Sequence, residues 1–384
     1  MNETFQEIMR TATRLTQSGR LAEATETIQR ALRGAASAGS VPDPMNTWAA
    51  GTSMPTAEAV RPKASPLVLE GCVFEVDARK PAAPDTGIGA FISGTHTHAS
   101  LTRRFKLYIP PGHVGRSLPL VVMLHGCTQD PDDFAAGTAM NERACEQGFF
   151  VLYPEQSQDA NPSRCWNWFK HNHQQRGRGE PALLASMTQT VMKEYGMDAR
   201  RVYVAGLSAG GAMAAIVAAA YPDLFAAVGV HSGLPSGAAN NVAEALMVMK
   251  SGNVGFVVPA KVGHPGAAAK APLQPQILVP TIVFHGDQDQ TVHPRNGEQV
   301  IAAAQGGAGS TRVEQGVSAQ GRRYTRSTRH GDKGQAVTEH WLVHGAGHAW
   351  SGGHATGSYT DASGPDATLE MLRFFFEHPR GLTH

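Results

Sequence analysis

A serine between two glycines, inside the stretch Arg201–Tyr221, has the setting of a catalytic nucleophile. The run Val202–Val204 predicts a short strand, Gly206-Leu207-Ser208-Ala209-Gly210 a tight turn, and Ala212–Ala220 a helix. A turn this tight leaves no space for side chains two residues before and two residues after the serine, which explains the two glycines. A serine at such a turn, with a helix N-terminus behind it, is placed to attack a carbonyl carbon while the helix favours the developing negative charge.

A carboxylate and a histidine are needed next, because a serine hydroxyl is a weak nucleophile without a base. After a strand–turn–helix of this kind, the acid and then the base follow the serine along the chain, each beyond a strand end. Asp287 and Asp289 both follow the predicted strand Thr281–Phe284, and alternation places them on the same side. We predict Asp289 as the acid, because it lies further into the loop and fits the pattern His-Gly-x-x-Asp-x-x-Val. Asp287 is then expected to hydrogen-bond the local backbone of a turn.

Position along the chain selects the base among 17 histidines. His348 lies in a glycine-rich loop directly after the last predicted strand, where its ring can swing over Ser208. We therefore predict His348 as the base. His344 is closer to the strand end and is expected to be packed or buried, and His354 stays an alternative.

Two backbone N–H groups are expected to bind the oxyanion that forms during attack on a carbonyl. One belongs to Ala209, directly after the serine, and the other belongs to Cys127, in the loop after the predicted strand Leu118–Leu124. Cys127 and Cys165 both lie in loops at the same predicted edge of the sheet. Two free thiols are as consistent with these positions as a disulfide is.

Three tryptophans are candidates for the substrate-binding walls of the site. Trp166, Trp168 and Trp350 lie in the predicted loops around the serine and can line an apolar groove for the acyl group. Ordinary packing is an equally good interpretation, because tryptophan is usually well buried in proteins.

The elements that must position these residues alternate between strands and helices from about residue 67 onward. Continuous apolar runs such as Leu118–Leu124 are typical of strands buried on both faces of a parallel sheet. We predict an α/β fold of the α/β-hydrolase type, a mostly parallel sheet with helices on both faces. The expected strands are Gly71–Val76, Phe105–Ile109, Leu118–Leu124, Phe149–Tyr153, Val202–Val204, Ala226–Val230, Thr281–Phe284, Arg322–Thr328 and Val337–Val343. The expected helices are Asp133–Gln147, Pro181–Tyr195, Ala212–Ala220, Val242–Met249, Pro294–Ala304 and Ala367–Phe376.

The chain is expected to contain three parts. Residues 1–34 have the apolar periodicity of a helical hairpin, 35–66 have the composition of a flexible linker, and 67–384 form the catalytic domain with an insertion near 234–276. A single helical hairpin cannot bury its apolar face alone. Residues 1–34 therefore pack on the catalytic domain, on another chain, or on an apolar surface such as a granule.

Composition excludes several classes of partner. Lys and Arg total 33 against 32 Asp and Glu, so a net charge of +1 gives no electrostatic case for nucleic acid or an anionic membrane. The uncharged run Val202–Ala220 is long enough for a membrane span, but the glycine-rich turn in its middle argues against one. The first residues have no secretory signal, which favours a cytoplasmic location. The predicted chemistry needs no metal or organic cofactor.

With these residues placed, residues 100–350 resemble the polyhydroxybutyrate (PHB) depolymerase-family esterases, short-chain polyhydroxyalkanoate depolymerases of the α/β-hydrolase class. The family is related to the feruloyl and acetylxylan esterases. The resemblance rests on Leu124–Gln129, Tyr153–Gln156, Cys165–Phe169, Arg201–Gly211, Tyr221–Ala226, His231–Gly233, His285–Asp289 with Val292, and Gly347–Trp350.

The resemblance implies a triad of Ser208, Asp289 and His348, and it favours a disulfide between Cys127 and Cys165. It also implies a carboxylic ester hydrolase that acts on short 3-hydroxyacyl polyesters or oligomers, with feruloyl or acetylxylan esters as the alternative. Family members are commonly extracellular, so that location stays open. The chain departs from the secreted depolymerases in its N-terminus and in lacking a polymer-binding domain after residue 378. A granule- or partner-binding protein that retains a hydrolase fold is the alternative from another class.

Overall fold

The structure is a computed structural model, and it describes residues 71–75, 89–252, 275–304, 309–332 and 334–381. The predicted hairpin and linker of residues 1–66 lie outside these ranges, as does the part of the expected insertion at 253–274. The three-part organisation of the chain therefore stays a prediction.

The described part of the chain is organised around an 11-stranded sheet in the order β1-β2-β3-β5-β4-β6-β7-β8-β11-β10-β9. The strands β5, β4, β6, β7, β8 and β11 run parallel, and antiparallel strands flank them on both sides. The strand bounds are β1 (Gly71–Glu75), β2 (Ala90–His98), β3 (Leu101–Ile109), β4 (Leu120–Leu124), β5 (Phe150–Pro154), β6 (Val202–Leu207), β7 (Ala227–His231), β8 (Thr281–Gly286), β9 (Ser310–Val317), β10 (Arg323–His330) and β11 (Ala336–Val343).

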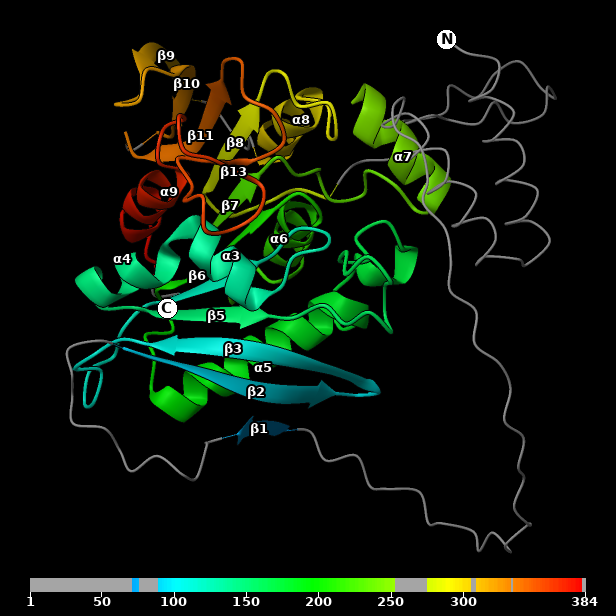
Figure 1. Ribbon diagram of the computed structural model, residues 1–384, viewed down its shortest axis with the longest axis vertical. Coiled ribbons are helices and arrows are strands. Elements are labelled where there is room, and N and C mark those ends of the chain that lie inside the picture. Colours follow the sequence, from blue (N-terminus) through cyan, green and yellow to red (C-terminus); the bar gives the residue numbers. More distant parts are fainter. Residues whose placement is uncertain (1–70, 76–88, 253–274, 305–308, 333, 382–384) are drawn as a thin grey trace, which may run out of the picture. The chain divides into compact units, whose positions relative to one another are not determined.

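Helices cover both faces of this sheet (Figure 1). One hydrophobic core joins the sheet to α5, α6, α7 and α8, and a second core on the other face joins it to α3, α4 and α9. This is the α/β-hydrolase fold that the alternation of elements predicts. The helix bounds are α3 (Pro131–Thr138), α4 (Met140–Gln147), α5 (Gly179–Tyr195), α6 (Ala209–Ala220), α7 (Val242–Ser251), α8 (Arg295–Ala304) and α9 (Ala367–Phe376).

The central strands are apolar because they are enclosed by helices. Every residue of β4, β5, β6, β7 and β8 is buried, in agreement with the continuous apolar runs in the sequence. The uncharged run Val202–Ala220 divides into the strand β6 and the helix α6. Among the described residues, no helix is long and apolar enough to cross a membrane.

Several elements differ from the sequence-based expectation. The expected helix Asp133–Gln147 is two helices, because Ala139 adopts a left-handed conformation (φ 51°, ψ 25°) between α3 and α4. β9 was not predicted, because this edge strand is largely exposed and carries no apolar alternation. β2 was also missed, because small and polar residues interrupt its apolar pattern.

Candidate active site

Ser208 occupies a strained turn between β6 and α6. Its backbone has φ 57° and ψ −118°, a region that side-chain-bearing residues rarely adopt. A Cβ atom on Gly206 would lie 2.4 Å from the backbone of Gly210, and one on Gly210 would lie 1.9 Å from the carbonyl oxygen of Leu124. Both glycines are therefore required by close backbone approach, and the predicted strand–turn–helix is confirmed.

Asp289 and His348 form a direct hydrogen bond. His348 Nδ1 lies 2.7 Å from Asp289 Oδ2, and the other carboxylate oxygen accepts the backbone N–H groups of Thr291 at 2.9 Å and Val292 at 2.8 Å. Because a carboxylate only accepts, the proton of the neutral imidazole lies on Nδ1. The lone pair of His348 Nε2 is then available to take a proton from another group.

The surroundings of Asp289 keep it ionised. Burial alone would raise the pKa of this carboxyl, but hydrogen bonds from the rings of His285 and His348, with the N–H of Val292, outweigh burial and lower the pKa well below its ordinary value. The carboxylate therefore carries a negative charge next to His348 throughout the neutral pH range. That charge orients the ring and stabilises it when it gains a proton.

Asp287 belongs to a second aspartate–histidine pair. Its Oδ2 lies 2.9 Å from His344 Nδ1, and its Oδ1 accepts the backbone N–H of Gly345 at 2.7 Å. The expectation that Asp287 bonds only to its local turn is therefore wrong, since both partners are more than 50 residues away along the chain. His344 is packed, as expected, although a third of its side chain is exposed. The alternative base His354 is exposed and bonds to Thr356.

His231 connects the serine turn to the loop that follows His348. The N–H of Ser208 donates to the carbonyl oxygen of His231 at 2.9 Å, and the N–H of Ser351 donates to His231 Nε2 at 2.9 Å. Burial, with the neighbouring rings of His285 and His348, lowers the pKa of His231 to about 3. The ring is therefore neutral, as its role as an acceptor requires. Sequence reasoning missed this role, and the only signal was a histidine at the end of a buried strand.

Ser208 and His348, the predicted nucleophile and base, lie at the same edge of the sheet. Ser208 follows β6, Asp289 follows β8, and β7 lies between these two strands. Among the described residues, no hydrogen bond joins the Ser208 hydroxyl to the His348 ring. Catalytic hydrogen bonds of this kind are often long in the free enzyme and tighten when the substrate binds.

The two amides predicted as oxyanion donors are uncommitted. In the loop after β4, the N–H of Gly126 donates to the Gln129 side chain at 2.9 Å, and the N–H of Thr128 donates to Ser163 at 2.7 Å. The N–H groups of Cys127 and Ala209 have no hydrogen-bond partner within the described ranges. Both are therefore free to bind an oxyanion, and Ala209 adds the favourable end of the α6 dipole.

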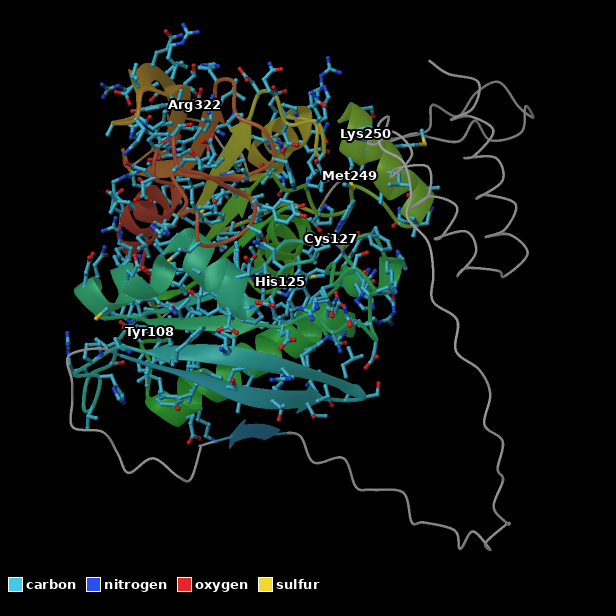
Figure 2. The ribbon with its side chains drawn as sticks, in the orientation of Figure 1. Tyr108, His125, Cys127, Met249, Lys250 and Arg322 are labelled. Atoms are coloured by element: carbon cyan, nitrogen blue, oxygen red, sulfur yellow. A yellow bond between two sulfur atoms is a disulfide. The ribbon has the colours of Figure 1, made fainter. Side chains whose placement is uncertain are left out.

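The disulfide that the resemblance favours is present. Cys127 is bonded to Cys165, with the two Cα atoms 4.2 Å apart, and Cys145 takes no part in a disulfide. Figure 2 shows Cys127 next to His125 on the loop beyond β4. The disulfide joins the loop of the predicted oxyanion donor to the loop that contains Trp166 and Trp168.

A buried carboxylate fixes the loop after β5, which in turn is hydrogen-bonded to the start of the loop after β4. Glu180, at the start of α5, is completely buried and accepts hydrogen bonds from the side chains of Asn167 at 2.7 Å and Gln156 at 2.6 Å. The N–H of Gln156 then donates to His125 Nε2 at 3.1 Å. Burial alone would raise the pKa of Glu180, but hydrogen bonds from His173, Gln156 and Asn167 lower it. Sequence reasoning missed this network, because an acidic residue in a first helical turn ordinarily indicates only a dipole interaction.

The three tryptophans lie in the interior. Trp166, Trp168 and Trp350 are exposed by 0%, 4% and 1%, and the Trp350 ring packs edge-on against Phe134 with its Nε1–H bonded to Thr368. This burial favours the packing interpretation. Contact between these tryptophans and a substrate stays a prediction.

Comparisons with known proteins identify the family of this chain. Residues 103–331 match the family described as esterase PHB depolymerase. The chain is 32% identical over 214 residues to poly(3-hydroxyalkanoate) depolymerase C of Paucimonas lemoignei, covering 55% of this chain and 49% of that protein. It is 30% identical over 205 residues to probable acetylxylan esterase A of Aspergillus fumigatus, covering 50% of this chain and 51% of that protein. The chain thus spans about half the length of these two relatives.

A solved structure shares the fold. The acetyl xylan esterase from Aspergillus awamori superimposes with a TM-score of 0.52 at 20% sequence identity, covering 72% of this chain and 94% of that one. At this identity the likeness concerns the fold alone.

Proposed function

The chain belongs to the esterase PHB depolymerase family, and from that premise we propose that it is a serine esterase with Ser208 as nucleophile. The observation that supports the proposal most is the Asp289–His348 hydrogen bond of 2.7 Å, two strands away from the strained serine. The uncommitted amides of Cys127 and Ala209 supply the remaining part of an acyl-transfer site.

In the proposed reaction, the Ser208 hydroxyl oxygen attacks the ester carbonyl carbon while His348 Nε2 takes its proton. The amides of Cys127 and Ala209 donate hydrogen bonds to the oxyanion, and Asp289 stabilises the imidazolium. When the tetrahedral intermediate collapses, the bond to the alcohol breaks and His348 returns the proton to that alcohol. Water then attacks the acyl-enzyme with the same base, which releases the carboxylic acid and restores Ser208.

We propose short 3-hydroxyalkanoate oligomers as the substrate class. The relative from Paucimonas lemoignei, whose name describes a poly(3-hydroxyalkanoate) depolymerase, supports this choice. Acetylated xylan is the second candidate, because the acetylxylan esterase of Aspergillus fumigatus matches over a similar length. Feruloyl esters are a related alternative, since feruloyl esterase B of Thermothelomyces thermophilus is 28% identical over 210 residues.

A substrate panel tests both the activity and the substrate class. Purified protein is assayed for kcat/KM on p-nitrophenyl butyrate, 3-hydroxybutyrate oligomers, acetylated xylo-oligosaccharides and methyl ferulate, with Ser208→Ala as the blank. We expect hydrolysis of p-nitrophenyl butyrate and the highest kcat/KM on the hydroxybutyrate oligomers. A wild-type protein that hydrolyses none of these esters faster than its Ser208→Ala variant would contradict the proposal.

The disulfide bears on the compartment of the protein. Disulfides persist in oxidising compartments and are rare in a reducing cytosol. The Cys127–Cys165 bond therefore does not support the cytoplasmic location expected from the N-terminal residues, and we favour the extracellular alternative. Mass spectrometry of cell fractions after thiol alkylation tests this, and recovery of the protein only in the cytosol with both thiols reduced would refute it.

Docking or self-association through residues 1–34 stays a prediction, as does the granule-binding alternative. Removal of residues 2–66 separates these ideas. Loss of granule binding with full esterase activity would assign the segment to docking, whereas loss of an oligomer would assign it to self-association.

A further inference from the structure

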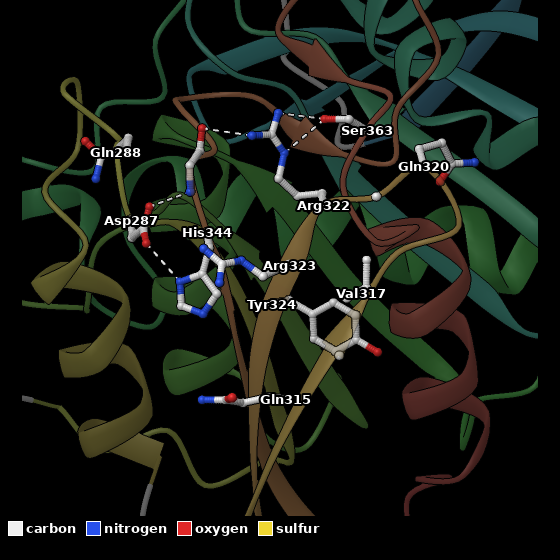
Figure 3. A pocket seen from close by; sticks show the side chains of 13 residues that line it. Asp287, Gln288, Gln315, Val317, Gln320, Arg322, Arg323, Tyr324, His344 and Ser363 are labelled. Atoms are coloured by element: carbon white, nitrogen blue, oxygen red, sulfur yellow. Dashed lines mark hydrogen bonds and ion pairs between the residues drawn. The ribbon is translucent and has the colours of Figure 1, made fainter.

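A cavity outside the active site lies next to the Asp287–His344 pair. Its volume is about 690 Å³, which is within the range of small-molecule sites. Figure 3 shows its lining, which comes from the strands β9 and β10 with the turn between them, and from the loops after β8 and β11. The side chains that matter here are Asp287, Gln315, Arg322, Arg323, Tyr324 and His344.

The cavity opens at the same edge of the sheet as the serine. His344 directly follows β11 and Arg323 begins β10, while Asp287 is two residues before Asp289. Strands β6 and β10 are four inter-strand steps apart in the sheet order, so the cavity lies roughly 19 Å from the strand that carries Ser208. It can therefore receive a distant group of a long substrate, but not the ester that reacts.

The strand pairing directs Arg323 into this cavity. Arg323 lies opposite Val317 of β9, and its carbonyl oxygen accepts the N–H of His344 at 2.9 Å. Residues that face each other across antiparallel strands project to the same side of the sheet. Val317, Arg323 and His344 therefore form one row, and Figure 3 shows the Arg323 side chain beside the His344 ring.

The other charged groups of the cavity are already committed. Asp287 holds the His344 ring and the Gly345 N–H, and the hydrogen bond from Thr325 occupies His344 Nε2 at 2.9 Å. Arg322 donates to Asp361 at 3.2 Å, as well as to the carbonyl oxygen of Gly345 and to the Ser363 hydroxyl. These bonds fix the floor of the cavity and pair the Arg322 guanidinium with the Asp361 carboxylate.

Arg323 differs from these groups. In the described ranges of the chain, its guanidinium makes no ion pair and no side-chain hydrogen bond. One guanidinium therefore faces the cavity with its N–H groups available, and the amides of Gln315 and Gln320 are further hydrogen-bond donors. A guanidinium presents parallel N–H groups that match the two oxygens of a carboxylate.

We propose that this cavity is an accessory subsite for a carboxylate carried on the substrate at a distance from the reacting ester, with Arg323 as the ligand of that carboxylate. The inference rests on the proposed esterase function. A hydroxyacyl oligomer ends in a free carboxylate, and an acidic side group on a saccharide ester supplies the same chemistry. Binding at Arg323 favours acidic oligomers over neutral ones of the same length.

Paired substrates test the subsite. We compare kcat/KM on hydroxybutyrate oligomers with a free carboxylate against the same oligomers as terminal methyl esters. A second pair compares acetylated xylo-oligosaccharides with and without a uronic acid. For each pair, the acid-to-neutral ratio is measured for wild type, Arg323→Ala, Arg323→Lys and the control Arg312→Ala. Arg312 is a matched control because it is an exposed arginine on β9 that contacts Glu314 and does not line this cavity.

We expect the Arg323→Ala ratio to fall about tenfold on the favoured pair, through KM, as for the loss of one charge-assisted hydrogen bond. Arg323→Lys should restore part of the ratio, added salt should lower the wild-type ratio, and Arg312→Ala should keep it. The pair that responds identifies the source of the carboxylate. An Arg323→Ala ratio equal to wild type on both pairs would overturn the subsite while leaving the esterase intact. If the wild-type protein hydrolysed none of these esters, the proposed function and the subsite would both be refuted.

Discussion

Removal of the Cys127–Cys165 disulfide should destabilise the protein much more than it slows catalysis. We consider the double variant Cys127→Ser with Cys165→Ser. The disulfide closes a loop with a sequence separation of 38 residues. The entropy that such a loop removes from the unfolded chain is about 13 cal/mol/K, which corresponds to about 4 kcal/mol at 25 °C. We therefore expect the free energy of unfolding to fall by about 3–4 kcal/mol.

The native arrangement should survive, because other bonds join the same loops. The N–H of Thr128 donates to Ser163 at 2.7 Å, and Gln156, which Glu180 holds at 2.6 Å, donates its N–H to His125 Nε2 at 3.1 Å. Loss of a whole oxyanion donor costs about a hundredfold to a thousandfold in turnover. The backbone N–H at position 127 remains in the variant, so we expect kcat to fall by less than about tenfold.

Urea unfolding followed by tryptophan fluorescence measures the first effect, and kcat on p-nitrophenyl butyrate measures the second. Cys145→Ser is the control, because that cysteine takes no part in a disulfide and is only partly buried. An unfolding free energy unchanged by the double substitution would refute the stabilising role of the disulfide. A thousandfold loss of kcat would instead show that the hydrogen bonds around Glu180 do not hold the oxyanion loop.

Two further predictions concern stability. Gly210→Ala places a Cβ atom 1.9 Å from a strand carbonyl oxygen, so urea denaturation should show a loss of about 3 kcal/mol or more, whereas Gly381→Ala, which meets open space, should unfold as wild type does. Burial lowers the pKa of His125, His231 and His340 to about 4, 3 and 4, so below about pH 6.5 the unfolded chain binds more protons than the folded one. The contribution of these histidines to the free energy of unfolding is full above that pH and should fall by up to about 4 kcal/mol per pH unit on acidification. Urea midpoints that stay constant between about pH 7 and 5.5 would contradict this prediction.

The central strands of the fold could be predicted from the sequence, because helices cover both faces of the sheet that they form. Burial on both faces requires continuous apolar runs such as Leu120–Leu124, and these runs are visible without a structure. The edge strand β9 has mostly exposed residues, so neither of its faces imposes a pattern. The break at Ala139 was also hidden, because the residue in the left-handed conformation is an alanine and not a glycine.

Part of the candidate site could likewise be predicted from the sequence, and part of it could not. Ser208, Asp289 and His348 could be assigned from their order and from their positions after strands, since the fold fixes both. The roles of His231 and Glu180 depend on contacts with residues distant in the sequence, which no local pattern encodes. The pairing of Asp287 with His344 was missed for the same reason. Strand alternation could not reveal it, because it places Asp287 and Asp289 on the same side of the strand.

Covalent labelling of the nucleophile tests the proposed mechanism most directly. The wild-type protein is treated with a fluorophosphonate, and the modified peptide is located by mass spectrometry. We predict one label per chain, on Ser208, with labelling abolished in Ser208→Ala and slowed by at least about a hundredfold in His348→Ala, because the base that activates the hydroxyl is then missing. Stoichiometric labelling of a different residue, or unchanged labelling of the Ser208→Ala variant, would contradict the assignment of Ser208 as the nucleophile.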